Sequence, residues 1–385
     1  MSEWKKVPIK DVCVGIYDGP HATPPVSETG GIFLGISNIT KDGHFDFSSI
    51  KYIGDDYMPK WTKRVTPQKD DIVFSYEATL NLYAVIPDGF YGCLGRRMAL
   101  IRTNKQLVNH KYLFYYFFSK NWRNLISEKT IVGATVDRIP IATFPDFEIE
   151  LPSLDVQNKI ATILSRYDSL IENYQKQIKL LEESAQRLYK EWFIDLRFPG
   201  HENTKIVDGV PEGWEKKRVG DIAEFKRGKT ITKKEIVEGN IPVVAGGLEP
   251  AYYCNKSNTD DRVITISGSG ANAGYTRMYF EKIWASDCSF ADSSITPYLH
   301  FVFCFLRDNK TIIDNMQKGA AQPHVYAKDI NLMGICIPTE IMLKSFEEIV
   351  SKYFDTISSL QSQIRHLTEA RDRLLPKLMS GEIEV

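Results

Sequence analysis

Long hydrophobic runs are missing from this 385-residue sequence. No apolar stretch approaches the ~18 residues that a membrane-spanning helix needs. The opening residues, Met1 to Lys6, are not followed by the apolar region of a signal peptide. We therefore expect a cytoplasmic protein that does not contact a membrane.

Cysteine is scarce, and charge of one sign does not dominate. The six cysteines include no C-x-x-C pair, and no histidine stands at metal-ligand spacing from them. This pattern is typical of reduced thiols and argues against a disulfide framework or a zinc site, so we expect no bound metal. The formal net charge of −1 gives no sign of a polyanion ligand, so any nucleic-acid site must be a local basic patch.

Motifs for nucleotide chemistry are absent as well. No G-x-x-x-x-G-K-[ST] phosphate loop occurs, and the glycine-rich segment 268–274 has Ala273 in place of the third glycine of a dinucleotide site. Residues 275–280 lack the helix pattern that should follow, so we interpret 268–274 as a turn-rich loop. An adenine methyltransferase loop needs Asn or Asp before a Pro-Pro pair, whereas Pro24-Pro25 follows Thr23. We predict that the chain binds no cofactor and catalyses nothing by itself.

An internal repeat is the main feature that the sequence does contain. Residues 112–193 align without a gap on residues 298–379, an offset of 186 positions. The segments before them also open alike, near Trp4 and Trp214, but with an offset of 210. At this length two or more domains are expected, and the duplication predicts a pseudo-two-fold internal repeat.

Each copy of the repeat ends in a segment with the signals of a long helix. The first segment begins at Ser153 as N-cap and extends to about Phe193, and the second begins at Thr339 and ends near Gly381. Apolar residues recur in both at a period of 3.5, which predicts a coiled coil interrupted only by Arg371. The seam positions expected to form the coiled-coil and partner interface are Ile171, Tyr174, Ile178, Leu181, Leu188, Ile357, Leu360, Ile364, Leu367 and Leu374.

Helices of about forty residues form rods of roughly 60 Å, because each residue adds ~1.5 Å. We expect the two to pair antiparallel, since a globular block of about 140 residues separates them. The alternative is that each helix packs on its own globular domain. In the preferred arrangement the rods hold two globular blocks at a fixed distance.

The predicted fold class is therefore α+β, with two mixed α/β domains separated by two long helices that form an antiparallel coiled coil. The predicted boundaries are 1–150 and 199–337 for the domains and 151–198 and 338–385 for the helices, with a linker at 198–203. The aromatic helices expected at 112–118 and 298–306 are apolar nearly all round, so we assign them to the core. Short apolar runs predict strands at Ile32–Ile36, Asp71–Phe74, Leu82–Ile86, Met98–Arg102, Phe147–Leu151, Ile241–Val244, Val263–Ile266 and Gly334–Ile337.

Local basic clusters occur in both domains, and several have glycine neighbours that would let the backbone approach a duplex closely. For any single cluster the alternative is a solvated face. Their presence in both copies favours contacts with phosphates and base edges. The candidate DNA-binding residues are Lys60, Lys63, Arg64, Arg96, Arg97, Lys226, Arg227, Lys229, Thr230, Ser269, Asn272 and Arg277.

Taken together, the duplicated frame and the two long helices resemble the specificity subunit of type I restriction–modification systems. The resemblance covers nearly the whole chain and departs in one respect, because the Gly-Ala-x-Gln step at 319–322 has Val136 at its last position in the first copy. The segments that carry the resemblance are 19–24, 151–161, 267–275 with Trp284-Ala285, 355–357 and 373–381.

The resemblance implies a function in a bacterial or archaeal cytoplasm. The domains would be target-recognition domains, each binding one half of a bipartite double-stranded DNA site. The helices would dock two modification subunits that methylate adenine at N6, and two restriction subunits would join them. S-adenosylmethionine, ATP and Mg²⁺ would be bound by those partners, not by this chain.

Three other functions were weighed. A self-sufficient DNA methyltransferase is disfavoured by the missing cofactor loop. The chain would otherwise be the recognition subunit of a restriction system in which one enzyme both cuts and modifies. The third alternative is a coiled-coil adaptor that does not bind DNA.

Overall fold

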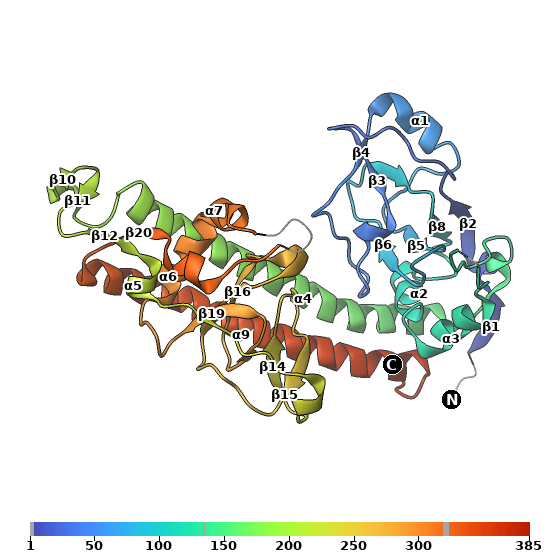
Figure 1. Ribbon diagram of the computed structural model, residues 1–385. Coiled ribbons are helices and arrows are strands. Elements are labelled where there is room, and N and C mark those ends of the chain that lie inside the picture. The colour runs from blue at the N-terminus through green and yellow to red at the C-terminus, as the bar shows by residue number, and fades with distance from the viewer. Residues whose placement is uncertain (1–3, 134, 319–322) are drawn as a thin grey trace. The chain divides into compact units, whose positions relative to one another are not determined.

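Two compact units make up the chain in the computed structural model, which describes residues 4–133, 135–318 and 323–385 (Figure 1). Unit 1 consists of residues 1–172 and 364–385, and unit 2 consists of residues 173–363. Each unit contains one globular block and parts of both long helices, α4 (Leu154–Tyr189) and α9 (Glu340–Met379).

Unit 1 contains a four-stranded and a three-stranded sheet. The four-stranded sheet has the order β2-β8-β5-β6 and antiparallel neighbours, and the other has the order β4-β3-β7, with β3 and β7 parallel. Strands β1 and β9 pair separately. The elements are β1 (Lys5–Pro8), β2 (Cys13–Asp18), β3 (Gly31–Leu34), β4 (Tyr52–Ile53), α1 (Met58–Trp61), β5 (Ile72–Ser75), β6 (Tyr83–Val85), β7 (Gly92–Leu94), β8 (Met98–Thr103), α2 (His110–Tyr116), α3 (Lys120–Lys129) and β9 (Glu148–Leu151).

Unit 2 has the corresponding sheets. Their orders are β13-β19-β16-β17 and β15-β14-β18, with β14 and β18 parallel, and β12 pairs with β20. The elements are β10 (Ile206–Val207), β11 (Val210–Pro211), β12 (Glu215–Arg218), α5 (Val219–Ile222), β13 (Lys226–Arg227), β14 (Ile241–Val244), β15 (Tyr252–Cys254), β16 (Val263–Ser267), β17 (Thr276–Tyr279), β18 (Trp284–Ala285), β19 (Cys288–Asp292), α6 (Leu299–Asp308), α7 (Lys310–Asn315), α8 (Ala327–Asn331) and β20 (Gly334–Ile337).

The strand orders of the two units correspond pair by pair. Strands β2, β8, β5 and β6 match β13, β19, β16 and β17, and the parallel pairing of β3 with β7 recurs as β14 with β18. The repeat is visible in the sequence without gaps only from residue 112 onward. In the structure it also includes the sheets of each block, where side chains and loop lengths have diverged.

Aromatic and aliphatic side chains from the short helices fill the cores. In unit 1, Tyr112 and Leu113 of α2 and Trp122 of α3 are fully buried. In unit 2, every residue of α6 from Leu299 to Leu306 is buried. The prediction that the aromatic helices belong to the core is therefore confirmed. Their burial removes their rings from any contact with bases.

Both long helices begin at the predicted caps. The Ser153 hydroxyl accepts a hydrogen bond from the backbone N–H of Val156 at 3.5 Å, and the Thr339 hydroxyl accepts one from Met342 at 3.4 Å. These contacts satisfy N–H groups that the first turn of a helix leaves without partners. At its other end, α4 continues into a π-helical turn at Lys190–Ile194.

The predicted seam residues are all buried or half-buried, as the heptad pattern of a coiled coil requires. In unit 2, the Phe346 ring on α9 contacts Trp192 at 5.9 Å and Phe193 at 5.0 Å between ring centroids. In unit 1, Leu378 of α9 belongs to the same core as Leu164 of α4. Within each unit, part of α4 therefore shares a core with part of α9.

Two local predictions are wrong. The segment 198–203 is not a free linker at its first residue, because the Phe198 ring is buried against Trp214 with ring centroids 5.0 Å apart. Burial of the aromatic ring outweighs the effect of the helix breakers that follow it. The strand predicted at Ile32–Ile36 ends at Leu34, because Ile36–Asn38 forms a 3₁₀ turn.

The segment 268–274 contains a 3₁₀ turn and is followed by strand β17, so the prediction of a turn-rich loop without a helix is confirmed. All six cysteines are free thiols. No helix among the described residues is long and apolar enough to cross a membrane. Ala134 and the step at 319–322 lie outside the described residues.

Candidate nucleic-acid interface

Three of the predicted arginines in unit 1 come close to one another at one end of the four-stranded sheet. Arg96 and Arg97 form the turn between β7 and β8, and the Tyr76 hydroxyl, just after β5, donates a hydrogen bond to the Arg96 carbonyl at 2.9 Å. Arg64 pairs with Asp18 at the end of β2. The pKa of Tyr76 is raised to about 12, first by burial and then by the charges of Asp18 and Glu77, while Arg64 opposes the rise. These groups therefore share one electrostatic environment.

The two arginines of this turn have different surroundings. The Nε atom of Arg97 lies 3.4 Å from a carboxylate oxygen of Glu77 but makes no hydrogen bond to any described residue. The Arg96 side chain is exposed, and within the described part of the chain it forms no ion pair. Both guanidinium groups therefore keep donors that a ligand can use.

Lys60 and Lys63 lie on the segment that leads to Arg64. Lys60 belongs to the short helix α1, and its ammonium group is 5.0 Å from the centre of the Trp61 ring. The Trp61 ring itself is buried, and both lysines are exposed. They present positive charge on the same segment as Arg64 and have no other role that the structure explains.

The glycines beside these clusters have a packing role within the chain. A side chain at Gly95 would lie 2.6 Å from the Leu34 carbonyl oxygen, and one at Gly228 would lie 2.3 Å from that of Ser286. Both glycines are therefore required by close approach of the chain to itself. This packing explains both glycines without DNA, and the interpretation that they also allow a duplex to approach the backbone stays a prediction.

In unit 2, four of the predicted residues follow one another along an exposed edge. Lys226 and Arg227 form β13, and Lys229 and Thr230 follow Gly228; all four side chains are exposed. The Lys229 backbone is held at both polar groups, since its N–H donates to the Ala285 carbonyl at 2.9 Å and its carbonyl accepts from the indole of Trp284 at 2.7 Å. The backbone is thus fixed while the side chains face outward.

Ser269 and Asn272 lie in the loop after β16. The Ser269 hydroxyl donates a hydrogen bond to a carboxylate oxygen of Asp287, which belongs to the turn between β18 and β19. The Asn272 amide donates to the Gly246 carbonyl at 3.4 Å. The structure therefore brings this loop next to the β18–β19 turn, where the predictions included no residue.

Arg277 occupies a different position from the other candidates. It lies on β17, donates to the Leu248 carbonyl at 2.7 Å, and stacks over the Tyr279 ring at 4.8 Å. It also lines a cavity of about 350 Å³ together with Glu182 of α4. Burial raises the pKa of Glu182, while Arg307 and Arg277 lower it.

The same backbone hydrogen bonds hold these loops together in both units, and we refer to them as the tip frame. In unit 1 they are Gly19 N–H to Met98 O (2.8 Å), Gly95 N–H to Leu34 O (2.8 Å), Tyr76 N–H to Arg97 O (3.2 Å) and Ile139 N–H to Tyr76 O (2.8 Å). In unit 2 they are Gly228 N–H to Cys288 O (2.8 Å), Ser286 N–H to Val244 O (2.7 Å), Gly268 N–H to Asp287 O (3.1 Å) and Val325 N–H to Gly268 O (3.1 Å).

The tip frame identifies polar residues that sequence reasoning missed. A β-bridge places Arg138 opposite Glu77 in unit 1, and the equivalent bridge places His324 opposite Ser269 in unit 2. Arg138 and His324 are separated by the repeat offset of 186, so the alignment of the two copies was a usable signal for this pair. Asp287 gave no such signal, because the turn that carries it is one residue shorter than its counterpart in unit 1.

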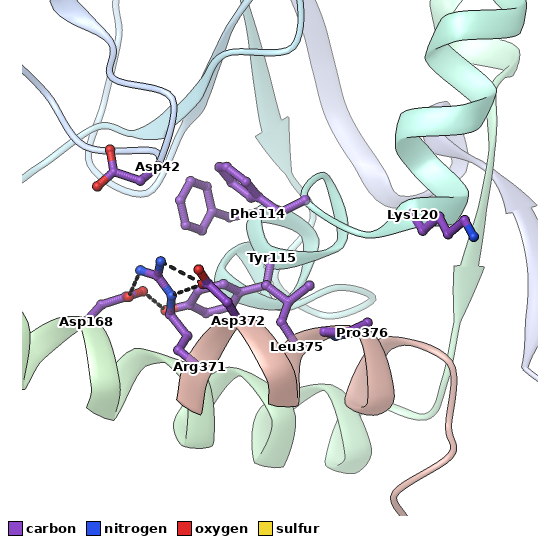
Figure 2. Close-up of a pocket in the computed structure, with 10 residues that line it drawn as sticks. Asp42, Phe114, Tyr115, Lys120, Asp168, Arg371, Asp372, Leu375 and Pro376 are labelled. Atoms are coloured by element: carbon purple, nitrogen blue, oxygen red, sulfur yellow. Dashed lines mark hydrogen bonds and ion pairs between the residues drawn. The ribbon is translucent and has the colours of Figure 1, made fainter. Parts of the chain in front are cut away.

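A second polar cluster lies on the helix seam of unit 1, where Arg371 interrupts the heptad pattern. Arg371 donates to Asp168 of α4 at 2.8 Å and to Asp372 at 2.9 Å, and Tyr115 donates to Asp168 at 2.5 Å (Figure 2). Burial lowers the pKa of Arg371, but its bonds to Asp168 and Asp372 outweigh that effect and the net pKa is raised. The cluster borders a cavity of about 360 Å³ lined also by Phe114, Phe118, Leu375 and Pro376.

The pKa of Tyr115 is raised above its usual range, first by burial and then by the charge of Asp168 and the hydrogen bond to it. The interruption of the seam is therefore a paired charge that is hydrogen-bonded on two sides.

For metal chemistry, the described residues hold no group of three or more His, Cys, Asp or Glu side chains arranged around a common point.

Comparison with known proteins gives consistent results. A family model described as "Type I restriction modification DNA specificity domain" matches residues 1–183 and again residues 211–369. The chain is 33% identical over 306 residues to the type I restriction enzyme MjaIX specificity subunit of Methanocaldococcus jannaschii, covering 73% of this chain and 71% of that protein. It is 22% identical to the type I restriction enzyme HindI specificity subunit of Haemophilus influenzae, with both chains fully covered.

Among solved structures, a type I restriction–modification S subunit from M. genitalium has the same fold. It superposes with a TM-score of 0.60 and 19% sequence identity, covering 98% of this chain and 96% of that chain.

Proposed function

Because the chain belongs to the family of type I restriction–modification DNA specificity subunits, we propose that it recognises a two-part DNA target. Each globular block binds one half-site, and the bases between the half-sites are not contacted. The duplicated tip frame is the observation that carries this proposal. It gives both blocks the same backbone arrangement, with different polar side chains beside it.

Contacts with DNA are assigned to the basic residues beside the tip frame. Arg64, Arg96 and Arg97 serve the first half-site, and Arg227 and Lys229 serve the second. Arginine donors are suited to guanine edges and to phosphates, and lysines to phosphates. The other candidates are Lys60, Lys63, Lys226, Thr230, Ser269, Asn272 and Arg277. Among these, Arg277 is the one that lies on β17, and it is held by contacts within unit 2.

The two long helices set the distance between the half-sites. We assign them an antiparallel pairing along their whole length, supported by the cores that α4 and α9 share within each unit. Two recognition blocks on one face of a duplex need half-sites about one helical turn apart, roughly 34–36 Å. Helices of 36 and 40 residues are long enough to span such a distance.

The chain contributes recognition and leaves catalysis to its partners. The exposed faces of α4 and α9 dock two modification subunits, which methylate adenine at N6 with S-adenosylmethionine. Two restriction subunits, which use ATP and Mg²⁺, join the complex to cleave unmodified DNA. Partner subunits also supply much of the positive charge that a chain of net charge −1 lacks.

Methylome sequencing tests the proposal directly. A host lacking the system is given the full chain together with the methyltransferase gene of its own operon, and adenine methylation is mapped across the genome. We expect a bipartite motif with a fixed spacer that disappears when the chain is omitted. Methylation that is absent, or that does not depend on this chain, would contradict the proposed function.

A further inference from the structure

The strongest unexplained feature is the chemical contrast between side chains that stand on equivalent positions of the tip frame. The hydrogen bonds Tyr76 N–H to Arg97 O and Gly268 N–H to Asp287 O make Arg97 the counterpart of Asp287. The β-bridges make Glu77 the counterpart of Ser269 and Arg138 the counterpart of His324. Each position thus carries a different hydrogen-bonding group in the two units.

We propose that these three pairs, Glu77/Ser269, Arg97/Asp287 and Arg138/His324, are the base-reading positions of the two units. The inference rests on the proposed function, which it extends from a surface to individual positions. The backbone gives both units one geometry, and the side chains on it select different bases.

Several observations separate these positions from ordinary surface residues. The tip frame is held by main-chain bonds, and the side chains at the three paired positions take no part in those bonds. Within each unit the first two positions already contact each other, Glu77 with Arg97 at 3.4 Å and Ser269 with Asp287. Such contacts orient the side chains before a ligand arrives, which reduces the entropy cost of binding.

The first unit also has hydrogen-bonding capacity to spare. The Nε donor of Arg97 is buried without a hydrogen bond to any described residue, although a buried donor normally has one. Arg138 is exposed at the facing position of the bridge. The Arg97 side chain as a whole is half-buried, so its terminal N–H groups, together with those of Arg138, can donate to a ligand with paired acceptors.

The chemistry of the positions predicts which bases each unit selects. Guanidinium groups pair with the O6 and N7 acceptors of guanine, so the half-site of unit 1 should contain guanine at the positions contacted by Arg97 and Arg138. A carboxylate accepts from the N4 amino group of cytosine. The half-site of unit 2 should therefore contain a cytosine at the position contacted by Asp287.

The test transfers the tip side chains of unit 2 to unit 1. The full chain carrying Glu77→Ser, Arg97→Asp and Arg138→His is expressed with the methyltransferase of its operon, and its motif is compared with that of the wild-type chain. Unit 2 carries these residues at the equivalent positions of its own tip frame. We expect the first half-site to lose its preference for guanine by roughly 10- to 100-fold and the second half-site to stay unchanged.

Single variants keep the test decisive if the triple variant fails to fold. Arg138→His changes an exposed side chain, and Lys69→Ala, at an exposed lysine paired with Asp88, is the matched control. An unchanged motif with Arg138→His, or a change in both half-sites, would overturn the inference. So would weakening of binding by the same factor for all sequences in a titration, which would identify phosphate contacts. Failure of the proposed function itself is distinguishable, because the wild-type chain would then direct no motif.

Discussion

The ion pair between Asp168 and Arg371 is the place where the helix seam of unit 1 differs most from the equivalent seam of unit 2. At the equivalent positions, 186 residues away along the repeat, unit 2 has Phe354 and Ala185, both buried. One copy of the seam therefore contains an ion pair where the other contains two apolar residues of the same core. The ion pair is mostly buried, with side chains 15% and 12% exposed.

Breaking this pair should destabilise unit 1. Arg371→Ala leaves the Asp168 carboxylate buried without its cation, which costs about 3 kcal/mol. For a unit of this size that corresponds to a fall in melting temperature of roughly 6–12 °C, measured by calorimetry. Arg373→Ala is the matched control, because that side chain is 83% exposed on the same helix. Equal melting temperatures for the two variants would contradict the role assigned to Arg371.

The double variant Asp168→Phe, Arg371→Ala copies the apolar pair of unit 2. It removes both charges together, so no buried charge is left unpaired, although the Tyr115 hydroxyl loses the bond that it donates to Asp168. We expect it to recover most of the stability that Arg371→Ala loses. A double variant that is less stable than Arg371→Ala would show that the cavity beside Phe114 does not accept the ring.

The free thiols give a second prediction at the residue scale. Burial raises the pKa of Cys13, Cys93 and Cys288 to about 12. At pH 8 only about one such thiol in ten thousand is ionised, whereas an unfolded cysteine with a pKa near 8.5 is ionised to about a quarter. Iodoacetamide should therefore label these three slowly in the native protein and rapidly in urea, as read by mass spectrometry of peptides. Fast native labelling of Cys288 would contradict the burial described here.

At the scale of elements, the parts that could be predicted from the sequence are those whose pattern is long. The helices α4 and α9 were predicted with their caps, because forty residues of heptad pattern and a Ser or Thr cap leave little ambiguity. Strands β13 and β18 were not predicted, since each has only two residues in register with a partner. Their pairing is set by distant segments, which a local pattern does not contain.

The candidate site was only partly accessible from the sequence for the same reason. Arginine clusters are visible as charge, so Arg96 and Arg97 were selected. Glu77 and Asp287 could not be selected in this way, because backbone contacts with other segments of the chain place them at the site. The packing role of Gly95 could not be predicted from the sequence, because the carbonyl oxygen that excludes a side chain there comes from the distant residue Leu34.

The proposed role of the helices gives a prediction at this scale. One heptad inserted between Gln175 and Lys176, matched by one between Gln361 and Ser362, keeps the seam in phase. It lengthens the proposed antiparallel pair by about 10 Å, since each residue adds ~1.5 Å. The preferred spacer should grow by about three base pairs, at 3.4 Å each, while both half-sites stay the same. Methylome sequencing measures both quantities.

An insertion in α4 alone is the control, because it leaves seven residues without seam partners and should lower the melting temperature. If the double insertion changes the half-sites but not the spacer, the helices do not set the distance between the half-sites.

At the scale of the whole molecule, the two blocks should recognise their half-sites independently. Unit 2 has its own core and its own tip frame, so its specificity should not depend on unit 1. Replacing residues 205–337 by the equivalent block of a relative with a different target should exchange one half of the methylated motif. The other half and the adenine methylation should be retained.

The packing of unit 2 decides how such a chimera must be built. The Phe301 ring of the block contacts Phe193 of the π-helical turn after α4 at 4.9 Å between ring centroids, so the donor block needs an aromatic residue at that position. A second chimera that exchanges the whole unit, residues 173–363, carries its own helix contacts and is free of this requirement. If recognition is modular, both chimeras change the same half-site in the same way. A chimera of 205–337 that folds, as judged by circular dichroism, but alters both half-sites would show that base selection depends on more than one block.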